Sequence, residues 1–299
     1  MSQINEQILP PRINLPSLEK NVLELRALKD FFLTGLVWGL AILASIPLIS
    51  VIYMLIMEGG ARLDFEAITA LPPAGFETGG GFGNAIVGTL TMVGIASALS
   101  IPIGTMAALY LAILNPNSKT ATVSRFLSKV LTGFPSILAG VFVYAVIVIT
   151  TGTYSAWAGG VALAVLMLPT VTLAAEEAMK QVPQRMKDAA FGMGCTRTQV
   201  IFKVVLPTAL PGIMTGVILA VAGAAGESAP LLFTALFSNY YMSELAEPTA
   251  SLSILIYNFS GMPFENQIEL AWTASLALVL LVLFFNIVAR VVGRTKFRE

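Results

Sequence analysis

Six long apolar stretches, separated by polar segments, set the hydrophobic pattern of this chain. A helix needs roughly 20 consecutive apolar residues to cross a bilayer, and each stretch reaches that length. The expected spans are about 31–57, 84–114, 126–150, 157–179, 208–237 and 268–292. The pattern therefore predicts an all-α integral membrane protein with six transmembrane helices.

The composition agrees with a bilayer as the solvent. Of the 299 residues, 56% are hydrophobic and 11% are charged, whereas soluble domains carry about 25% charged residues. The mean hydropathy is +0.82, and a soluble core of this size could not bury so much apolar surface. The sequence has no histidine, which removes the commonest metal ligand and acid–base group. A soluble fold is excluded, and a membrane enzyme is disfavoured.

The basic residues are distributed unevenly among the loops. Of the 17 Lys and Arg residues, all except Arg62 lie before the first span, in or beside the connections 115–125 and 180–207, or at or after the end of the last span. The positive-inside rule places these segments, and with them both termini, in the cytoplasm. This alternation requires an even number of spans, which agrees with six.

The topology divides the chain into four segments. Residues 1–30 form a cytoplasmic N-terminal segment, and residues 31–83 hold the first span and its external loop. Residues 84–292 form the core, with five spans and a cytoplasmic loop at 180–207, and residues 293–299 form a cytoplasmic tail. The first apolar stretch is longer than the h-region of a cleavable signal peptide, so we expect none.

Two external segments have distinctive patterns. The glycine run at 79–81 indicates a flexible hinge between the external loop and the remaining spans. The apolar stretch 252–259, LSILIYNF, is too short to cross a bilayer. We interpret it as a re-entrant or interfacial segment that lines a cavity.

The loop at 180–207 predicts a helix–turn–helix on the cytoplasmic surface. Pro183 favours the start of a helix over 184–191, and the glycines that follow, notably Gly194, end it. A second short helix, about 197–205, should stop at the prolines that begin with Pro207. The pair of alanines inside the first helix offers a flat face for close packing.

Within this loop an acid, two alanines, a glycine, an aliphatic residue and a proline stand at fixed offsets. They are Asp188, Ala189, Ala190, Gly194, Val204 and Pro207. This spacing resembles the EAA loop of ABC importer permeases, with aspartate in place of the usual glutamate. The resemblance implies a type I, MetI-like permease bundle whose coupling helix docks on an ATP-hydrolysing subunit. The alternative interpretation is a basic amphipathic loop on anionic lipid.

The sequence lacks the G-x-x-x-x-G-K-[ST] loop that cradles nucleotide phosphates. The chain therefore cannot hydrolyse ATP by that route. The resemblance implies that this chain binds no cofactor or metal and that a partner ATPase binds ATP and Mg. It further implies a transport subunit and not an enzyme.

The segment GESAPLLFTA at 226–235 resembles the signature of phosphate-specific ABC importer permeases of the PstA type. GFPSILAGVF at 133–142 and LPTVTLAAEEAMKQVP at 168–183 agree with it, and the match covers roughly 79–290. The resemblance implies import of inorganic phosphate. It also implies a heterodimer with a second related permease, two ATP-binding subunits, an external phosphate-binding protein and surrounding membrane lipid, with no nucleic acid.

Glu227 is the notable charge of the fifth predicted span, which holds no Lys or Arg to pair with it. A lone charge at mid-bilayer costs at least ~2.5–3.5 kcal/mol, so such residues face a cavity or a partner. Three interpretations stay open: an ion pair with a cation on the partner permease, a part of the translocation gate, or a protonated donor in helix packing. A carboxylate repels an anion, so it is not assigned as a phosphate ligand.

Neutral donors complete the expected translocation pathway. Ser228, beside Glu227, fits a locally opened helix, and Thr170 and Thr172 supply hydroxyls from the fourth span. Leu173 and Gly223 stand where phosphate permeases often carry arginine, the natural clamp for phosphate. An importer of another oxyanion or small solute is therefore an alternative, and an ion-gradient-driven secondary transporter is an alternative from another class.

Overall fold

The computed structural model describes the backbone of residues 25–294 and the side chains of residues 28–288. Every regular element in this range is helical. In chain order the elements are α1 (Leu25–Gly60), α2 (Phe65–Thr69), α3 (Gly83–Leu109), η1 (Tyr110–Leu114), α4 (Lys119–Thr132), α5 (Ser136–Val143), η2 (Tyr144–Val148), α6 (Ile149–Thr151), α7 (Ala156–Lys180), α8 (Gln184–Gly192), α9 (Arg197–Val200), η3 (Ile201–Val205), α10 (Leu206–Gly226), α11 (Ala229–Leu232), α12 (Leu252–Ser260) and α13 (Glu265–Arg294).

The chain divides into two compact units at Tyr53 and Met54. The described part of the first unit is most of α1, whose residues Leu28–Gly60 are long and apolar enough to cross a membrane despite the internal Pro47. The second unit holds the remaining helices. The predicted first span is therefore confirmed as a helix, with a start several residues earlier than expected.

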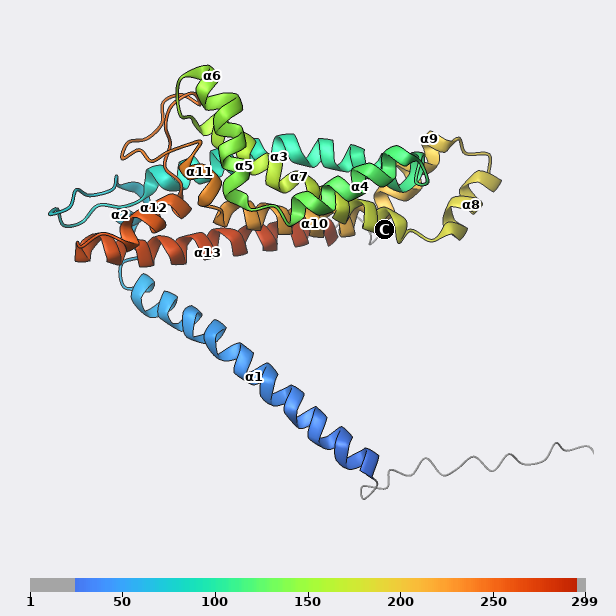
Figure 1. Ribbon diagram of the computed structural model, residues 1–299, viewed down its shortest axis with the longest axis horizontal. Helices are drawn as coiled ribbons and strands as arrows, with labels where there is room; N and C mark the ends of the chain where they lie inside the picture. The colour runs from blue at the N-terminus through green and yellow to red at the C-terminus, as the bar shows by residue number, and fades with distance from the viewer. Residues whose placement is uncertain (1–24, 295–299) are drawn as a thin grey trace, which may run out of the picture. The chain divides into compact units, whose positions relative to one another are not determined.

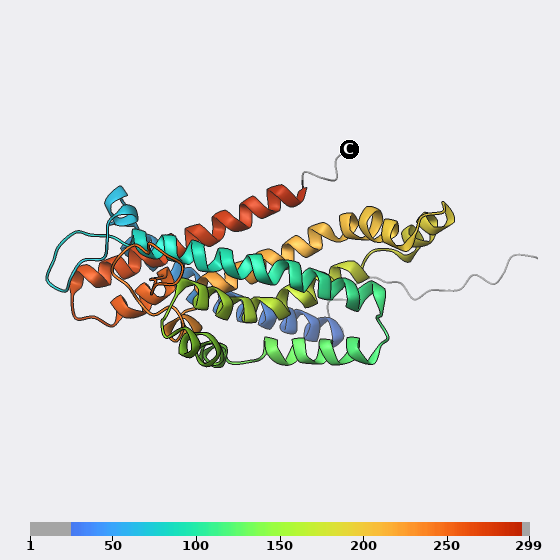
Figure 2. The same ribbon diagram turned by 90° about the horizontal axis from the view of Figure 1, so that it is seen from above.

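The second unit is a bundle in which α3, α7, α10 and α13 run lengthwise beside one another (Figures 1 and 2). Each belongs to a helix long and apolar enough to span a bilayer, which confirms four of the predicted spans as helices. Small residues let these helices approach closely. A Cβ added at Gly216 of α10 would lie 2.2 Å from the Cβ of Ala174 on α7.

The predicted third span is a broken helix. The axis of α4 and that of the continuous α5–η2–α6 segment differ by 105°, and α5 turns away from the long axis of the bundle (Figure 1). Gly133 and Pro135 lie between them. Proline removes a backbone donor and disfavours helix in the preceding residue, which explains why an apolar run does not give a straight helix.

The predicted fifth span differs at both ends from what hydropathy indicated. The helix begins at Arg197 and runs through η3 into α10 as one span to Gly226, and not from about 208 to 237. The expected stop at Pro207 is wrong because η3 is a π-helical turn, in which the N–H of Leu206 bonds the carbonyl of Ile201. The wider turn accommodates the proline within a continuous helix.

After α10 the chain forms α11 and then α12, which covers the predicted segment 252–259. Leu252, Ile254 and Leu255 of α12 are almost completely buried. The N–H of Leu252 donates to Thr89 Oγ1 of α3 at 2.9 Å, and the side chain of Ser251 caps the helix. This agrees with a short segment that enters the bundle without crossing it. That it lines a cavity stays a prediction.

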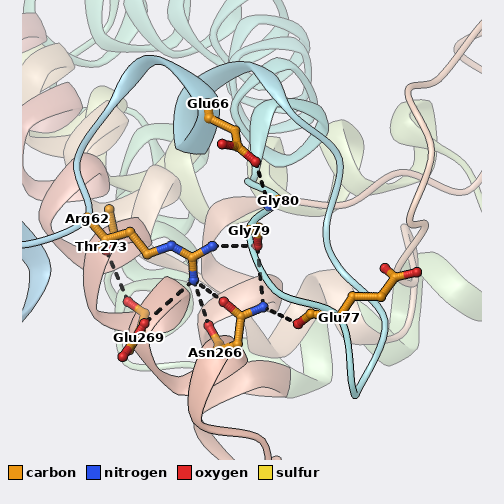
Figure 3. Close-up of polar contacts among 8 residues, drawn as sticks. All are labelled: Arg62, Glu66, Glu77, Gly79, Gly80, Asn266, Glu269 and Thr273. Atoms are coloured by element: carbon orange, nitrogen blue, oxygen red, sulfur yellow. Dashed lines mark hydrogen bonds and ion pairs between the residues drawn. The ribbon is translucent and has the colours of Figure 1, made fainter.

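The loop before α3 is fastened to the start of α13 by Arg62 (Figure 3). Its guanidinium donates to the carbonyl of Gly79 and to both oxygens of Asn266, and it lies 3.7 Å from Glu269. The N–H of Gly80 donates to Glu66 at 3.0 Å. The glycine run has positive φ values, +80° and +75° at its first two residues. Glycine is thus required by the backbone conformation, and these contacts do not support a free hinge.

Candidate functional site

The predicted helix–turn at one end of the bundle is present as α8 and the bend that follows it. Pro183 precedes the first turn, as expected. The N–H of Gly194 donates to the carbonyl of Phe191 at 2.9 Å, and that of Cys195 to Ala190 at 3.1 Å. Gly194 has φ +82°, a conformation that L side chains adopt only at a cost of about 1–2 kcal/mol. The bend is therefore specified by this glycine.

The two alanines of α8 do not share one exposed face. Ala190 is buried against the bundle, whereas Ala189 and Asp188 are exposed. A carboxylate oxygen of Asp188 accepts a hydrogen bond of 2.8 Å from the side chain of Gln184, one turn earlier. The expectation of a flat two-alanine face is corrected: one alanine anchors the helix and the other faces outward. Of the remaining loop residues, Val204 is half-buried and Pro207 exposed.

Large apolar side chains are exposed around α8. They are Met186, Phe191, Met193 and Phe202. Met193 is 78% exposed and Phe202 62%. Arg185 beside them is also exposed. An exposed apolar patch with a charged border is typical of a surface that another protein covers. This patch, together with Ala189, is called the α8 patch below.

A buried ion cluster joins α4 and the last turns of α7 and was not predicted from the sequence. Glu176 of α7 is 3% exposed. It accepts a hydrogen bond of 2.5 Å from Nε of Arg125 on α4, and Nζ of Lys180 lies 2.6 Å away. Arg125 also donates to the carbonyls of Pro116 and Leu111 at 2.9 and 2.6 Å. The signal was present, because Glu176 and Lys180 are one helical turn apart.

A second guanidinium ties the start of α9 to the end of the α3–η1 helix. Arg197 donates to the carbonyls of Ile113 and Leu114 at 2.8 and 2.7 Å. These two carbonyls belong to the last turn of a helix and would otherwise lack partners. The end of the loop that carries α8 is thereby attached to the α3–η1 helix.

A cavity of about 450 Å³ lies where several helices are interrupted. It is lined by Thr132 and Ser136 at the break between α4 and α5, by Thr170 of α7, and by Gly223 and Glu227 at the end of α10. The structure thus brings together two of the residues expected in the pathway, Thr170 and Glu227. This space is called the central cavity below.

The central cavity lies near the middle of the spans. At about 1.5 Å rise per residue, Thr170 is about 21 Å beyond Ala156 and about 15 Å before Lys180 along α7. Glu227 caps the end of α10 with extended backbone. It therefore lies just beyond the helix that was expected to contain it.

The other two residues expected in the pathway lie elsewhere. Thr172 is buried, donates to the carbonyl of Leu168 at 2.7 Å, and borders a separate space of about 250 Å³ with Tyr110. Ser228 begins α11, where its carbonyl accepts from the N–H groups of Leu231 and Leu232. Of the two positions where arginine was noted as absent, Gly223 lines the central cavity.

At the opposite end of the bundle from α8, a hollow of about 630 Å³ surrounds Arg62 (Figures 1 and 3). Five carboxylates line it: Asp64, Glu66, Glu77, Glu265 and Glu269. Arg62 is the only cation among its lining residues and is already engaged by Gly79, Asn266 and Glu269. This surface therefore does not favour an anion.

Residues 100–298 match the family described as the inner membrane component of binding-protein-dependent transport systems. The chain belongs to this family. It is a multi-pass inner-membrane permease, a transport component that works with ATPase and substrate-binding partners.

Curated relatives are similar along nearly the whole chain. The phosphate transport system permease protein PstA of Yersinia pestis is 35% identical, covering 93% of this chain and 91% of the relative. The PstA protein of Pasteurella multocida is 37% identical, covering 91% and 93%. A probable PstA protein of Methanocaldococcus jannaschii is 38% identical, covering 88% and 92%.

Solved ABC transporters share the fold. The MetNI methionine transporter in an inward-facing conformation gives a TM-score of 0.59 at 22% identity, covering 73% of this chain and 96% of that one. A bacterial alginate transporter gives 0.62 at 17% identity, covering 92% and 99%. The predicted MetI-like permease fold is thereby confirmed.

Proposed function

We propose that this chain is the transmembrane permease subunit of an ATP-dependent importer of inorganic phosphate. The observation that carries the proposal is its similarity to PstA permeases over about nine-tenths of both chains. The fold and the loop that carries α8 agree with a subunit that moves solute and receives energy from outside. ATP hydrolysis then resides in a partner ATPase, which binds ATP and Mg.

The α8 patch is the proposed contact with that ATPase. Ala189, Asp188 and the exposed side chains around them enter a groove of the ATPase, while Ala190 and Gly194 hold the helix and its bend. Val204 and Pro207 belong to the helix that carries the movement into the bundle. Closure of two ATP-binding subunits on nucleotide would shift the equilibrium between inward- and outward-open states by its differential affinity for them.

The assembly is proposed to contain a second, homologous permease subunit and an external phosphate-binding protein. The distribution of Lys and Arg supports an orientation with both termini and α8 in the cytoplasm. The hollow around Arg62 then faces the exterior. The phosphate-binding protein delivers its solute on that side of the membrane.

The central cavity is the proposed part of the translocation pathway in this chain. Thr170 faces it together with Glu227, and Ser228 supports the backbone where α10 ends. Thr172 stabilises α7 from its buried side and does not contact the solute. Neutral hydroxyls can donate hydrogen bonds to a passing anion without binding it so tightly that it cannot be released.

One observation favours another oxyanion or small solute. Gly223 and Leu173 occupy positions where phosphate permeases often carry arginine. A competition assay in membrane vesicles that contain the whole transporter decides between the two. ATP-dependent uptake of labelled phosphate should fall with excess unlabelled phosphate and persist with excess sulfate or molybdate. Stronger competition by sulfate or molybdate would overturn the assignment of phosphate.

A further inference from the structure

Glu227 has an unusual environment for a carboxylate. It is half-buried at the end of α10 and lines the central cavity near mid-depth. Its backbone is held in place: its N–H donates to Ala224 at 3.2 Å, and its carbonyl accepts from Ser253 Oγ at 2.9 Å. These two hydrogen bonds hold the backbone of Glu227, and with it the start of the side chain, at a defined point in the bundle.

No Lys or Arg among residues 54–288 forms an ion pair with Glu227; the pairs in that range join Arg62, Arg125 and Lys180 to other acids. The position also opposes a negative charge, because carbonyl groups at a helix C-terminus carry partial negative charge. Water screens a charge poorly at this depth, and intramembrane carboxylates are usually paired. Glu227 thus needs a cation that these residues do not provide.

The cavity has room for that cation directly beside the carboxylate. Gly223 lies one helical turn before Glu227, and a Cβ added there would meet nothing within 4 Å. The other polar lining groups are neutral hydroxyls, and that of Thr132 is already used in a 2.9 Å bond to the carbonyl of Ser128. A long basic side chain could enter over Gly223 without displacing any side chain of residues 54–288.

The edge of the cavity is apolar. Leu131, Phe134 and Leu219 line it and are exposed, Leu219 to 67%. Lipid would cover these side chains but would leave the carboxylate uncompensated. A protein surface that is apolar and carries one cation would cover the apolar edge and also compensate the carboxylate. The second permease subunit of the proposed function would provide such a surface.

We propose that the central cavity is part of the interface with the second permease subunit, and that a Lys or Arg of that subunit enters over Gly223 and forms an ion pair with Glu227. The inference rests on the proposed function only in requiring a second permease. It identifies the cavity wall as an interaction surface and Glu227 as the residue that selects a basic partner side chain.

Cross-linking in the whole transporter tests the contact. Cys195→Ser removes the native thiol, Glu227→Cys adds a new one, and each Lys or Arg in the spans of the second permease is changed to Cys in turn. We expect a short bifunctional thiol-alkylating reagent to join one such pair, because the lengths of the two replaced side chains place the backbones beyond the reach of a disulfide. The same partner positions should give no cross-link to Glu244→Cys in the exposed loop after α11. Absence of any cross-link to Glu227→Cys, in a transporter that still assembles, would overturn the proposal.

Charge reversal tests the ion pair. Glu227→Lys should lower ATP-dependent uptake at least ten-fold, and changing the cross-linked partner cation to Glu should restore it in part, whereas Glu244→Lys should have little effect. Wild-type uptake by Glu227→Gln would overturn the pairing and favour a neutral packing role. Failure of the wild-type transporter to import phosphate would instead contradict the proposed solute, because the cross-link does not depend on which solute moves.

Discussion

Nε of Arg125 on α4 donates a 2.5 Å hydrogen bond to Oε1 of Glu176 on α7. The pair joins the first half of a broken span to the helix that leads into α8. Because Arg125 also bonds the carbonyls of Leu111 and Pro116, it fixes α4, the end of η1 and α7 together. Under the proposed function, a movement of α8 would then displace α7 together with the helices that are fixed to it.

Removal of one partner should destabilise the bundle strongly. Glu176→Gln leaves Arg125 without its carboxylate in a buried place, and breaking a buried pair from one side costs about 3–5 kcal/mol. We expect a clearly lower midpoint of thermal unfolding for the purified transporter. Glu177→Gln is the matched control, because Glu177 is adjacent but exposed. Equal midpoints for the two variants would contradict the role of the cluster.

The bend after α8 should be sensitive to substitution at one glycine and not at the other. Gly194 has φ +82° and Gly192 is helical, while neither has a neighbour within 4 Å of an added Cβ. Gly194→Ala should therefore be strained by about 1–2 kcal/mol and should reduce ATPase stimulation. Gly192→Ala should leave it close to wild type.

A bulky side chain at the bend tests docking more severely. Gly194→Trp should abolish both uptake and stimulation of the partner ATPase, while the subunit remains inserted in the membrane. Insertion is checked by its presence in the washed membrane fraction. Unchanged transport by this variant would remove the coupling role from α8.

Close packing between α7 and α10 can be tested by a double substitution. Gly216→Ala would place a Cβ 2.2 Å from that of Ala174, and such overpacking costs typically about 1–3 kcal/mol. Adding Ala174→Gly should recover much of the loss in unfolding midpoint. Gly94→Ala, where an added Cβ meets nothing within 4 Å, is the control. No rescue by the second change would argue against this contact.

The contacts of Arg62, at the end of the bundle opposite α8, should stabilise the loop before α3. Arg62→Met removes the donors to Gly79 and Asn266, and hydrogen bonds from a charged group contribute about 1.5–3 kcal/mol each. We expect faster amide hydrogen exchange across 61–82 and at the start of α13, without loss of the bundle. Exchange that matches wild type would show that the loop is held by other contacts.

Hydropathy and turn residues predicted the helical content, the position of four spans and part of a fifth, the α8 bend at Gly194 and the short apolar segment that forms α12. They failed where an apolar run does not stay one helix. The break before α5 was missed because the apolar run was counted across Gly133 and Pro135, although α4 is clearly more polar than α5. The π-helical turn before Pro207 was missed because proline was interpreted as a stop.

The candidate site was predicted in part. Thr170 and Glu227 lie on one cavity because α7 and α10 pack along their length, a tertiary relationship that no local pattern shows. The separation of Thr172 from Thr170 follows from helical geometry, since residues two apart face different directions. The Glu176 cluster was missed because its partner Arg125 lies 51 residues away on another helix, a contact that no local pattern shows.

Under the proposed function, this chain moves phosphate only when a separate ATPase acts on α8. The most direct measurement is uptake of labelled phosphate into proteoliposomes, with the purified chain alone or with the complete transporter, its external binding protein and ATP. We expect uptake by the complete transporter with ATP, even when the proton gradient is collapsed, and none by the chain alone. Uptake by the chain alone, driven by an ion gradient, would contradict it.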